Sequence, residues 1–491
     1  MSRKKVIVIG SGFGGLSVAA FLARDGYEVK VVEKNEQSGG RASVYKENGF
    51  IFDMGPSWYL MPDVFENFFE EFGKKSEDYY NLKRLDPAYR IFYERNDFVD
   101  LSADLEKNKQ NFEKLEAGAG EKLTKYLAQS EYQYNVSMRD FLYRDYDSVW
   151  QFFNRRMLVE GSKLHVFESL DKYTKRYFKS EKLRKILEYS MVFLGGAPKN
   201  TPAIYSLMSH IDFNLGVWYP DGGIGKVVEA MENLCKSLGV EFVFNNPVTK
   251  IITEKGKAVG VEVNREKINA DLVVANADYH FVETELLKAE DQTYKESYWK
   301  KRTIAPSAYV LFLGVNKKIS GLTHHNLFFD NDWMRHFDAI FEKPEWPEFP
   351  SYYVSCPSKT DSSVAPENCE NLFVLVPVAS GLEDTDEIRN EYAQKIIADL
   401  EEKLGESITQ NLTVKKIFSQ RDFASRYNAY KGTALGLSHT LRQTAIFRPR
   451  HQSKKVANLF YTGQYTHPGI GMPMCLISSQ IVASDIKKKY G

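Results

Sequence analysis

The chain has 491 residues, too many for one compact core, which predicts two or three structural units. Lys plus Arg and Asp plus Glu number 65 each, so no net charge indicates a nucleic-acid partner. The four cysteines (Cys235, Cys356, Cys369, Cys475) form no C-x-x-C pair, which argues against a disulfide framework or zinc site and favours the cytosol. We expect no secretory signal, and no run approaches the ~18 apolar residues that span a bilayer.

The chain begins with a short apolar run at 6–9 (VIVI), a glycine turn and a helix over 16–24, which together make the first half of a βαβ unit. Gly10 permits the tight turn, and Gly12 lets the backbone approach a pyrophosphate. Gly15 allows close packing of helix on strand, and the helix N-terminus faces the phosphate charge. The pattern predicts a nucleotide-binding turn; the alternative is a purely structural glycine turn.

A second strand over 27–32 ends at Glu33, where a ribose hydroxyl needs an acceptor. A lone G-x-G-x-x-G is a weak signal. Here the strand before it, the helix after it and the spacing of the acid all agree. The sequence therefore predicts a dinucleotide site.

Two further glycine segments follow, GGRA at 39–42 and GFIFDMGPS at 49–57. They resemble the extended fingerprint of the flavin-containing amine oxidase and phytoene desaturase superfamily. In that superfamily the paired glycines let a second loop close over the diphosphate, and the arginine, here Arg41, adds charge. A glycine-rich turn with a surface arginine is the alternative. The resemblance implies FAD rather than NAD.

Near the end of the chain an apolar strand over 458–462 runs into Gly463, followed by the segment 465–473 and a helix over 474–487. The resemblance implies that this strand and helix return to the first domain, with the helix N-terminus beside the pyrimidine end of the isoalloxazine. The superfamily often carries an acid after the glycine to bind the ribityl chain. This chain has Gln464, which can hydrogen-bond but supplies no charge.

Nearly the whole chain resembles a bacterial-type phytoene desaturase, an FAD-dependent carotenoid desaturase. The more specific matches are DMGPSW at 53–58, FLGGAP at 193–198, GVWYPDGG at 216–223 and THPGIG at 466–471. The resemblance implies a linear C40 carotenoid substrate, with phytoene and the 3,4 position of a 1-hydroxycarotenoid both left open. The residues that we expect to bind FAD are Gly10, Gly12, Phe13, Gly14, Gly15, Glu33, Lys34, Gly40, Arg41, Gly55, Pro56, Ser57, Val248, Gly463, Gln464, Gly471 and Met472.

The predicted fold class is α/β, α+β overall, built on a discontinuous Rossmann-like FAD domain. We assign residues 1–80, 219–290 and 430–491 to that domain. Its middle part contains a helix over 226–238, strands at 241–244, 248–253 and 258–263, and a buried strand within 270–277. The strand from Val248 resembles the family element whose backbone contacts the adenine.

Two insertions interrupt the FAD domain. Residues 81–218 read mostly as helix and are expected to form a lid that faces a membrane. Residues 291–429 contain strands at 308–315, 352–355 and 372–378, then a helix over 385–404, and are expected to form a sheet that binds substrate. The aromatic content of 14% suits either large aromatic cores or a long apolar tunnel.

The segment 149–185 combines aromatic residues with ten Lys or Arg and four Asp or Glu. Its aromatic residues are Trp150, Phe152, Phe153, Phe167, Tyr173, Tyr177 and Phe178. Basic charge beside exposed aromatics suits an anionic membrane surface, whereas buried aromatics on a solvated helix are the alternative. Because a C40 polyene dissolves only in lipid, we expect a monotopic contact with the inner face of the cell membrane.

The histidines suggest no metal site. His324 and His325 are adjacent, so on a strand they would point to opposite faces. His467 differs from the others, because its loop is expected beside the isoalloxazine. There it would polarise the flavin, contact a polar substrate end together with Tyr465 and Thr466, or simply orient its own turn.

The expected chemistry is loss of a hydride to flavin N5 and of a proton from a CH–CH pair beside conjugated double bonds. No nucleophile–base constellation is present, which fits an enzyme that mainly holds its substrate. Oxygen or a membrane quinone would reoxidise the flavin. The alternatives are an amine oxidase, an FAD-dependent carotenoid isomerase and a non-catalytic carotenoid- or flavin-binding protein.

Overall fold

The computed structural model describes residues 3–145, 163–166, 168–329, 332–440 and 442–491. Its centre is a parallel five-stranded sheet in the order β19-β13-β1-β2-β9. The strands are β1 (Lys5–Ile9), β2 (Glu28–Val32), β9 (Glu241–Val243), β13 (Leu272–Ala275) and β19 (Leu459–Tyr461). Three distant parts of the chain thus build one sheet, in line with the predicted Rossmann-like fold.

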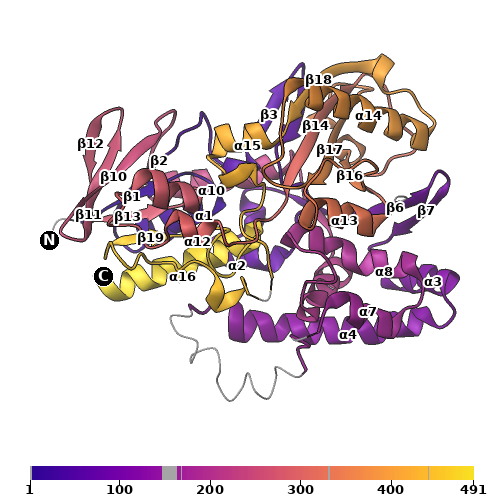
Figure 1. Ribbon diagram of the computed structural model, residues 1–491, viewed down its shortest axis with the longest axis horizontal. Helices are drawn as coiled ribbons and strands as arrows, with labels where there is room; N and C mark the ends of the chain where they lie inside the picture. Colours follow the sequence, from indigo (N-terminus) through magenta and orange to yellow (C-terminus); the bar gives the residue numbers. More distant parts are fainter. Residues whose placement is uncertain (1–2, 146–162, 167, 330–331, 441) are drawn as a thin grey trace.

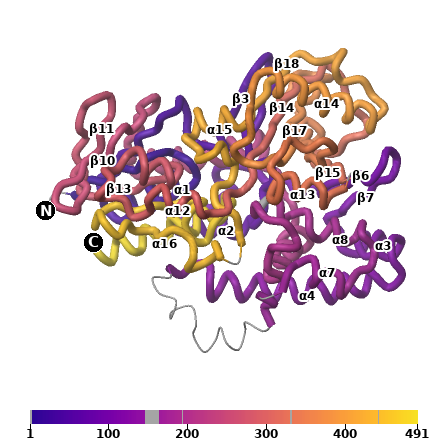
Figure 2. Tube along the Cα trace, viewed as in Figure 1, coloured from indigo at the N-terminus to yellow at the C-terminus, as the bar shows by residue number. Residues whose placement is uncertain are grey.

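Helices and a small second sheet cover the two faces of the parallel sheet. On one face lie α1 (Phe13–Arg24), α10 (Ile224–Ser237) and α16 (Met472–Tyr490), whose apolar residues share one core with β1 and β2. On the other face lies the antiparallel sheet of β10 (Val248–Glu254), β11 (Lys257–Val263) and β12 (Glu266–Asn269). The C-terminal helix runs beside this domain, with both chain ends at the same side of the molecule (Figure 1, Figure 2).

A seven-stranded mixed sheet forms the second part, in the order β18-β14-β17-β16-β15-β6-β7. Its strands are β6 (Tyr89–Glu94), β7 (Asp97–Leu101), β14 (Ser307–Val315), β15 (His325–Phe328), β16 (Tyr352–Ser355), β17 (Glu370–Val378) and β18 (Leu412–Phe418). Strand β14 is buried on both faces, with Tyr309 and Leu311 packed on α14 (Asp386–Leu404) and Val310 and Phe312 in the opposite core. Helix α13 (Trp333–Phe341) packs its aromatic side chains into that opposite core.

The third part is a helical lobe below the large sheet (Figure 1). It contains α3 (Leu105–Leu115), α4 (Ala119–Ser137), α7 (Leu170–Tyr177), α8 (Glu181–Glu188) and α9 (Leu207–His210). The described residues of 81–218 are mostly helical, but β6 and β7 among them extend the large sheet. The short pair β5 (Leu82–Arg84) and β8 (Trp218–Pro220) marks both ends of the lobe.

The remaining strands and α-helices of the described ranges are short. They are β3 (Val44–Glu47), β4 (Phe50–Asp53), α2 (Pro62–Glu70), α11 (Tyr279–Phe281), α12 (Glu296–Trp299) and α15 (Gln420–Tyr427). The predicted helices begin within three residues of the observed ones, since α1 starts at Phe13 and α16 at Met472. The N-cap residue of each helix is a glycine, Gly12 for α1 and Gly471 for α16. The N-terminal N–H groups of both helices therefore lack a side-chain cap.

The structure changes the interpretation of the basic, aromatic segment. Tyr173 and Phe178 are buried in the core of the helical lobe, contrary to the expectation of exposed aromatics. Trp150, Phe152, Phe153 and Phe167 lie outside the described residues. Among the helices of the described ranges, none is both long enough and apolar enough to cross a bilayer.

Candidate functional site

One cavity of about 850 Å³ begins at the carboxyl ends of the parallel strands and continues between the large sheet and the helical lobe. Its first part is lined by Ile9 and Val32, the last residues of β1 and β2, and by Asn276 directly after β13. Ligands of open parallel sheets bind at this edge. Most of the predicted cofactor residues lie here.

The glycine turn brings backbone to the cavity wall. Gly10, Gly12 and Gly14 line the cavity, whereas Gly15 does not. A Cβ on Gly12 would come within 2.9 Å of the Asn276 side chain, and one on Gly15 within 2.0 Å of the Gly10 carbonyl oxygen. The first three glycines thus leave backbone exposed to a ligand, and Gly15 allows the helix to pack on the strand.

Glu33 occupies the end of β2 and is buried in the cavity wall. Its Oε2 accepts hydrogen bonds from the Ser11 backbone N–H at 2.7 Å and the Ser11 hydroxyl at 2.8 Å. Its Oε1 accepts from the backbone N–H of Asn35 at 2.8 Å. Oε1 also accepts from the Asn35 side-chain amide at 3.0 Å, so four hydrogen bonds use the acceptor positions of this carboxylate. The carboxylate therefore fixes the glycine turn, and a ribose hydroxyl would replace one of these donors.

The second glycine loop lies against the first. Gly40 and Arg41 line the cavity, as do Gly55, Pro56 and Ser57. A Cβ on Gly55 would lie 2.5 Å from the Arg41 carbonyl oxygen, so this segment packs directly on the arginine backbone. The segments 39–42 and 49–57, which the sequence analysis assigned to one extended fingerprint, are therefore in contact.

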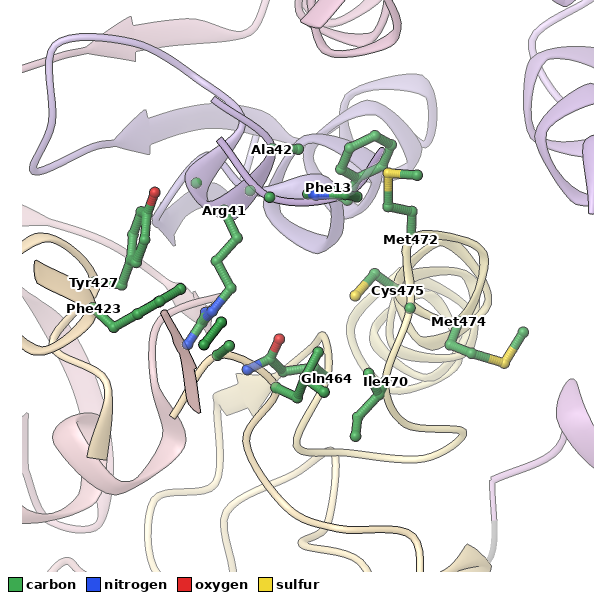
Figure 3. A pocket seen from close by; sticks show the side chains of 18 of the residues that line it. Phe13, Arg41, Ala42, Phe423, Tyr427, Gln464, Ile470, Met472, Met474 and Cys475 are labelled. Carbon is green, nitrogen blue, oxygen red and sulfur yellow. The ribbon is translucent and has the colours of Figure 1, made fainter. Parts of the chain in front are cut away.

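Two buried donors converge where these loops meet the C-terminal segment. The side chains of Arg41 and Gln464 extend toward one another across the cavity (Figure 3). The Arg41 Nε and the Gln464 Nε2 are both buried and have no hydrogen-bond partner in the protein. Unpartnered buried donors are costly, so they indicate a ligand that presents oxygen acceptors at this point. The diphosphate and ribityl chain of FAD carry such oxygens.

The C-terminal segment enters the cavity beside α16. Gly471 and Met472 line the cavity at the first turn of that helix, and Cys475 follows them (Figure 3). Gly463 does not line the cavity; its N–H donates to the Ser478 hydroxyl at 3.1 Å. The buried Arg448 donates to the carbonyl oxygens of Thr466 and Gln464, which holds the loop in place.

His467 and its neighbours are directed to protein partners. The His467 imidazole does not line the cavity, and its Nε2 donates to the Leu142 carbonyl oxygen at 3.1 Å. Burial lowers the pKa of His467 to about 4. Thr466 donates to the Gly463 carbonyl oxygen at 2.9 Å, and the Tyr465 hydroxyl donates to the Asp278 carboxylate. The geometry gives His467 a structural position and no contact with the cavity.

The remaining cofactor candidates also line the cavity. Phe13 lies near the start of α16, Lys34 follows Glu33, and Val248 starts β10 beside Pro247 and Thr249. The Lys34 ammonium donates to the Asn428 side chain at 2.8 Å, and burial lowers the pKa of Lys34.

Sequence reasoning missed several residues of the cavity wall. Asn276 and Asp278 follow the buried strand β13 at its carboxyl edge, a position that could have drawn attention to them. Burial raises the pKa of Asp278. Arg426 and Tyr427 come from α15, far away in the sequence, and no local pattern marks them.

The far part of the cavity is apolar. It is formed by the large sheet, α13 and the helical lobe. Its lining residues are Leu194, Leu207, Met208, Ile211, Val310, Leu327, Phe329, Trp333, Phe337, Ile340, Tyr353, Phe373 and Leu375. Such walls suit an extended hydrocarbon and exclude water.

The side chains of His324 and His325 do not point to opposite faces of a strand, as was predicted. Their ring centres lie 4.4 Å apart, because His324 precedes β15 and does not share its alternation. Within the described ranges no group of three or more His, Cys, Asp or Glu is arranged to hold a metal ion.

Comparison with known proteins gives a consistent result. Residues 13–487 match the family described as "Flavin containing amine oxidoreductase". A Haloarcula japonica protein described as carotenoid 3,4-desaturase is 47% identical over 98% of both chains. A zeta-carotene-forming phytoene desaturase of Myxococcus xanthus is 34% identical over 98% of this chain and 93% of its own. The crystal structure of a Methanosarcina mazei oxidoreductase shares the fold, with TM-score 0.65, 17% identity and coverage of 99% and 100%.

Proposed function

Because the chain belongs to the flavin-containing amine oxidoreductase family, we propose that it is an FAD-dependent carotenoid desaturase. The observation that carries this proposal is the similarity, along nearly the full length of both chains, to the Haloarcula japonica desaturase. The cavity agrees with it, since one end is built from backbone and charge and the other from apolar side chains. The enzyme would introduce C=C bonds into a linear C40 carotenoid.

The polar end of the cavity fits FAD. Gly10, Gly12 and Gly14 would face the diphosphate, with Arg41 as its cation and Glu33 as the ribose acceptor. Val248 would contact the adenine, and Gly471 and Met472 would lie at the flavin ring, beside the N-terminus of α16. The cofactor, when bound, supplies a two-electron hydride acceptor.

The apolar walls would hold the polyene by burial, worth about 25 cal/mol per Å² of apolar surface. A dry channel also keeps water from the cationic carbon chain formed during the reaction. Similarity to the Haloarcula japonica 3,4-desaturase favours desaturation of the 3,4 bond. Similarity to the Myxococcus xanthus enzyme keeps phytoene as a second candidate substrate. Recognition of a terminal hydroxyl by Tyr465, Thr466 and His467 is not supported, because all three groups bond within the protein.

We also propose that the protein rests on the inner face of the cell membrane, from which a lipid-dissolved substrate could enter. The basic composition of 149–185 supports this, although the burial of Tyr173 and Phe178 restricts the contact to other residues of the segment. The final electron acceptor would be oxygen or a membrane quinone.

Anaerobic addition of a carotenoid to the FAD-loaded protein tests the function. We expect loss of the flavin absorbance and a product lighter by two hydrogens. Unchanged product mass would indicate an isomerase, and bound polyene with unchanged flavin absorbance would indicate a binding protein. Expression in one host that makes phytoene and another that makes a 1-hydroxycarotenoid separates the two substrates.

A further inference from the structure

Desaturation releases a proton from the substrate, and a group of the protein must accept it. Two C–H bonds break: one hydrogen leaves as a hydride with both electrons of its bond, and the other leaves as a proton while its bonding pair becomes the new π bond. The substrate is oxidised and the flavin reduced by two electrons. The proton must then cross a cavity whose far walls are apolar.

One chain of polar groups interrupts these apolar walls. The Ser57 hydroxyl lies 2.9 Å from the Tyr353 hydroxyl, and both residues line the cavity. The Tyr353 hydroxyl also lies 2.7 Å from Nδ1 of His325. Ser57 follows the Gly55 segment that packs on Arg41, whereas Tyr353 belongs to the sheet. This series of polar groups therefore starts where the polar and apolar parts of the cavity meet.

The polar groups continue behind the cavity wall. The His325 ring stacks on Trp58, with ring centres 4.2 Å apart, and its Nε2 is buried without a hydrogen-bond partner. The His324 ring is 4.4 Å from it and also has a buried Nε2 without a partner. Nδ1 of His324 lies 2.8 Å from the hydroxyl of the half-buried Thr360.

We propose that Ser57, Tyr353 and His325 form a relay that takes up the proton lost from the substrate and passes it toward His324 and Thr360. Ser57 is the group that touches the substrate; the other two carry the proton onward. This proposal rests on the proposed desaturase function. In each transfer a hydroxyl accepts one proton and releases another; His325 then accepts a proton at Nδ1 and releases the one on Nε2 toward His324, which keeps the number of atoms and charges balanced.

The chemistry of the groups fits this role. Burial lowers the pKa of His325 well below its usual value, so the imidazole is neutral and free to accept. A weak base is sufficient, because a proton next to an allylic cation is strongly acidic. A histidine can accept at one ring nitrogen and release at the other.

Three other titratable groups in the cavity wall, His336, His439 and Asp278, already have hydrogen-bond partners in the protein. His336 donates from Nε2 to the Pro377 carbonyl oxygen at 2.8 Å and accepts at Nδ1 from the Ser351 N–H at 3.1 Å. His439 accepts from the Ile470 N–H at 3.2 Å and has its Nδ1 2.7 Å from the Tyr205 hydroxyl. Asp278 lies on the cofactor side and accepts from Tyr465.

Tyr353→Phe breaks the relay while keeping the ring. Its matched control is Tyr352→Phe, the next residue on β16, whose hydroxyl bonds Asp399 instead. Flavin absorbance and polyene product are followed together after anaerobic mixing, in H₂O and in D₂O. We expect product formation to fall at least about 100-fold in Tyr353→Phe, as for loss of a general base. His325→Gln should lower product formation to a similar extent. Both variants should bind FAD and carotenoid as tightly as the wild type. Tyr352→Phe should form product at the wild-type rate.

The solvent isotope effect separates a relay from a packing role. The wild type and Tyr352→Phe should form product more slowly in D₂O, and this effect should disappear in Tyr353→Phe. Product formation by Tyr353→Phe within twofold of the wild type would overturn the relay alone. Weaker carotenoid binding with an unchanged rate at saturation would also overturn it. A wild-type protein that desaturates neither carotenoid would overturn the proposed function and the relay together.

Discussion

The guanidinium of Arg41 lies over the ring of Tyr427, 5.4 Å from its centre, and so connects the second glycine loop to α15 of the substrate sheet region. Both residues line the cavity where FAD would bind. The aromatic face orients the cation without using any of its N–H donors, and the Arg41 Nε indeed has no protein partner. The contact leaves Arg41 prepared for an anionic ligand.

Tyr427→Leu should therefore weaken FAD binding by about 0.5–1 kcal/mol, the usual value of such a contact at a partly exposed site. Arg41→Ala should cost about 1.5–3 kcal/mol, since it removes the charged donor itself. Fluorescence titration of the apoprotein with FAD measures both. Tyr427→Phe keeps the ring and is the control. A loss in Tyr427→Phe equal to that in Tyr427→Leu would contradict the role of the ring.

Gly12→Val should abolish FAD binding. Even a Cβ at this position would lie 2.9 Å from the Asn276 side chain, and the larger side chain would fill the space for the diphosphate. Flavin absorbance of the purified variant measures the loss, with circular dichroism to follow folding. Gly26→Ala is the control. Its new Cβ would have no atom within 4 Å, and φ at this glycine is +93°. The change therefore strains the backbone far from the cavity without touching the site. A yellow Gly12→Val protein would refute the assignment.

Glu33→Ala should weaken FAD binding by about 1.5–3 kcal/mol, through loss of the ribose acceptor and of the bonds that fix Ser11. Calorimetric titration gives the affinity. The control is Glu28→Ala at the exposed start of the same strand, which should bind FAD as tightly as the wild type. Equal affinities of Glu33→Ala and wild type would remove Glu33 from the site.

Asp212→Asn should make the protein more stable at pH 8. Asp212 accepts from the hydroxyls of Tyr89 at 2.6 Å and Tyr189 at 3.1 Å, and the cost of burying its charge raises its pKa to about 7. Between about pH 4 and 7 the folded state holds a proton that the unfolded state has lost, so stability falls as pH rises. The loss is about 1.4 kcal/mol per pKa unit of the shift.

The Asn variant keeps the acceptor but has no charge to bury. Thermal unfolding at pH 5 and pH 8 tests this, with Asp338→Asn on the exposed face of α13 as control. The wild type should lose stability between these pH values, and Asp212→Asn should lose less. Identical pH dependence of the two proteins would contradict the raised pKa of Asp212.

Vesicles that contain anionic lipid should carry the protein upward in a flotation gradient. The cause would be the excess of Lys and Arg in 149–185, and high salt should reduce flotation because it screens exposed charge. Neutral vesicles are the control. Absence of flotation from anionic vesicles, with and without carotenoid, would disprove the membrane contact.

Local sequence determined the parts of the site that depend on backbone geometry. The glycine turn, Glu33 and the Arg41 loop were predictable because a tight turn, a close phosphate approach and an acid at the strand end restrict residue type within a short stretch. The strands β14, β16 and β17 were predictable because runs of apolar and β-branched residues favour buried strands.

Only the tertiary structure decided which distant side chains meet. Nothing near Tyr427 indicates that its ring supports Arg41, and nothing near His325 indicates that it lies behind Ser57 and Tyr353. The direction of His467 away from the cavity likewise depends on the helical lobe, because the Leu142 carbonyl oxygen there accepts a hydrogen bond from Nε2 of His467. Local patterns specify strands, turns and helices, whereas the packing of those elements fixes which side chains reach the cavity and which bond inside the protein.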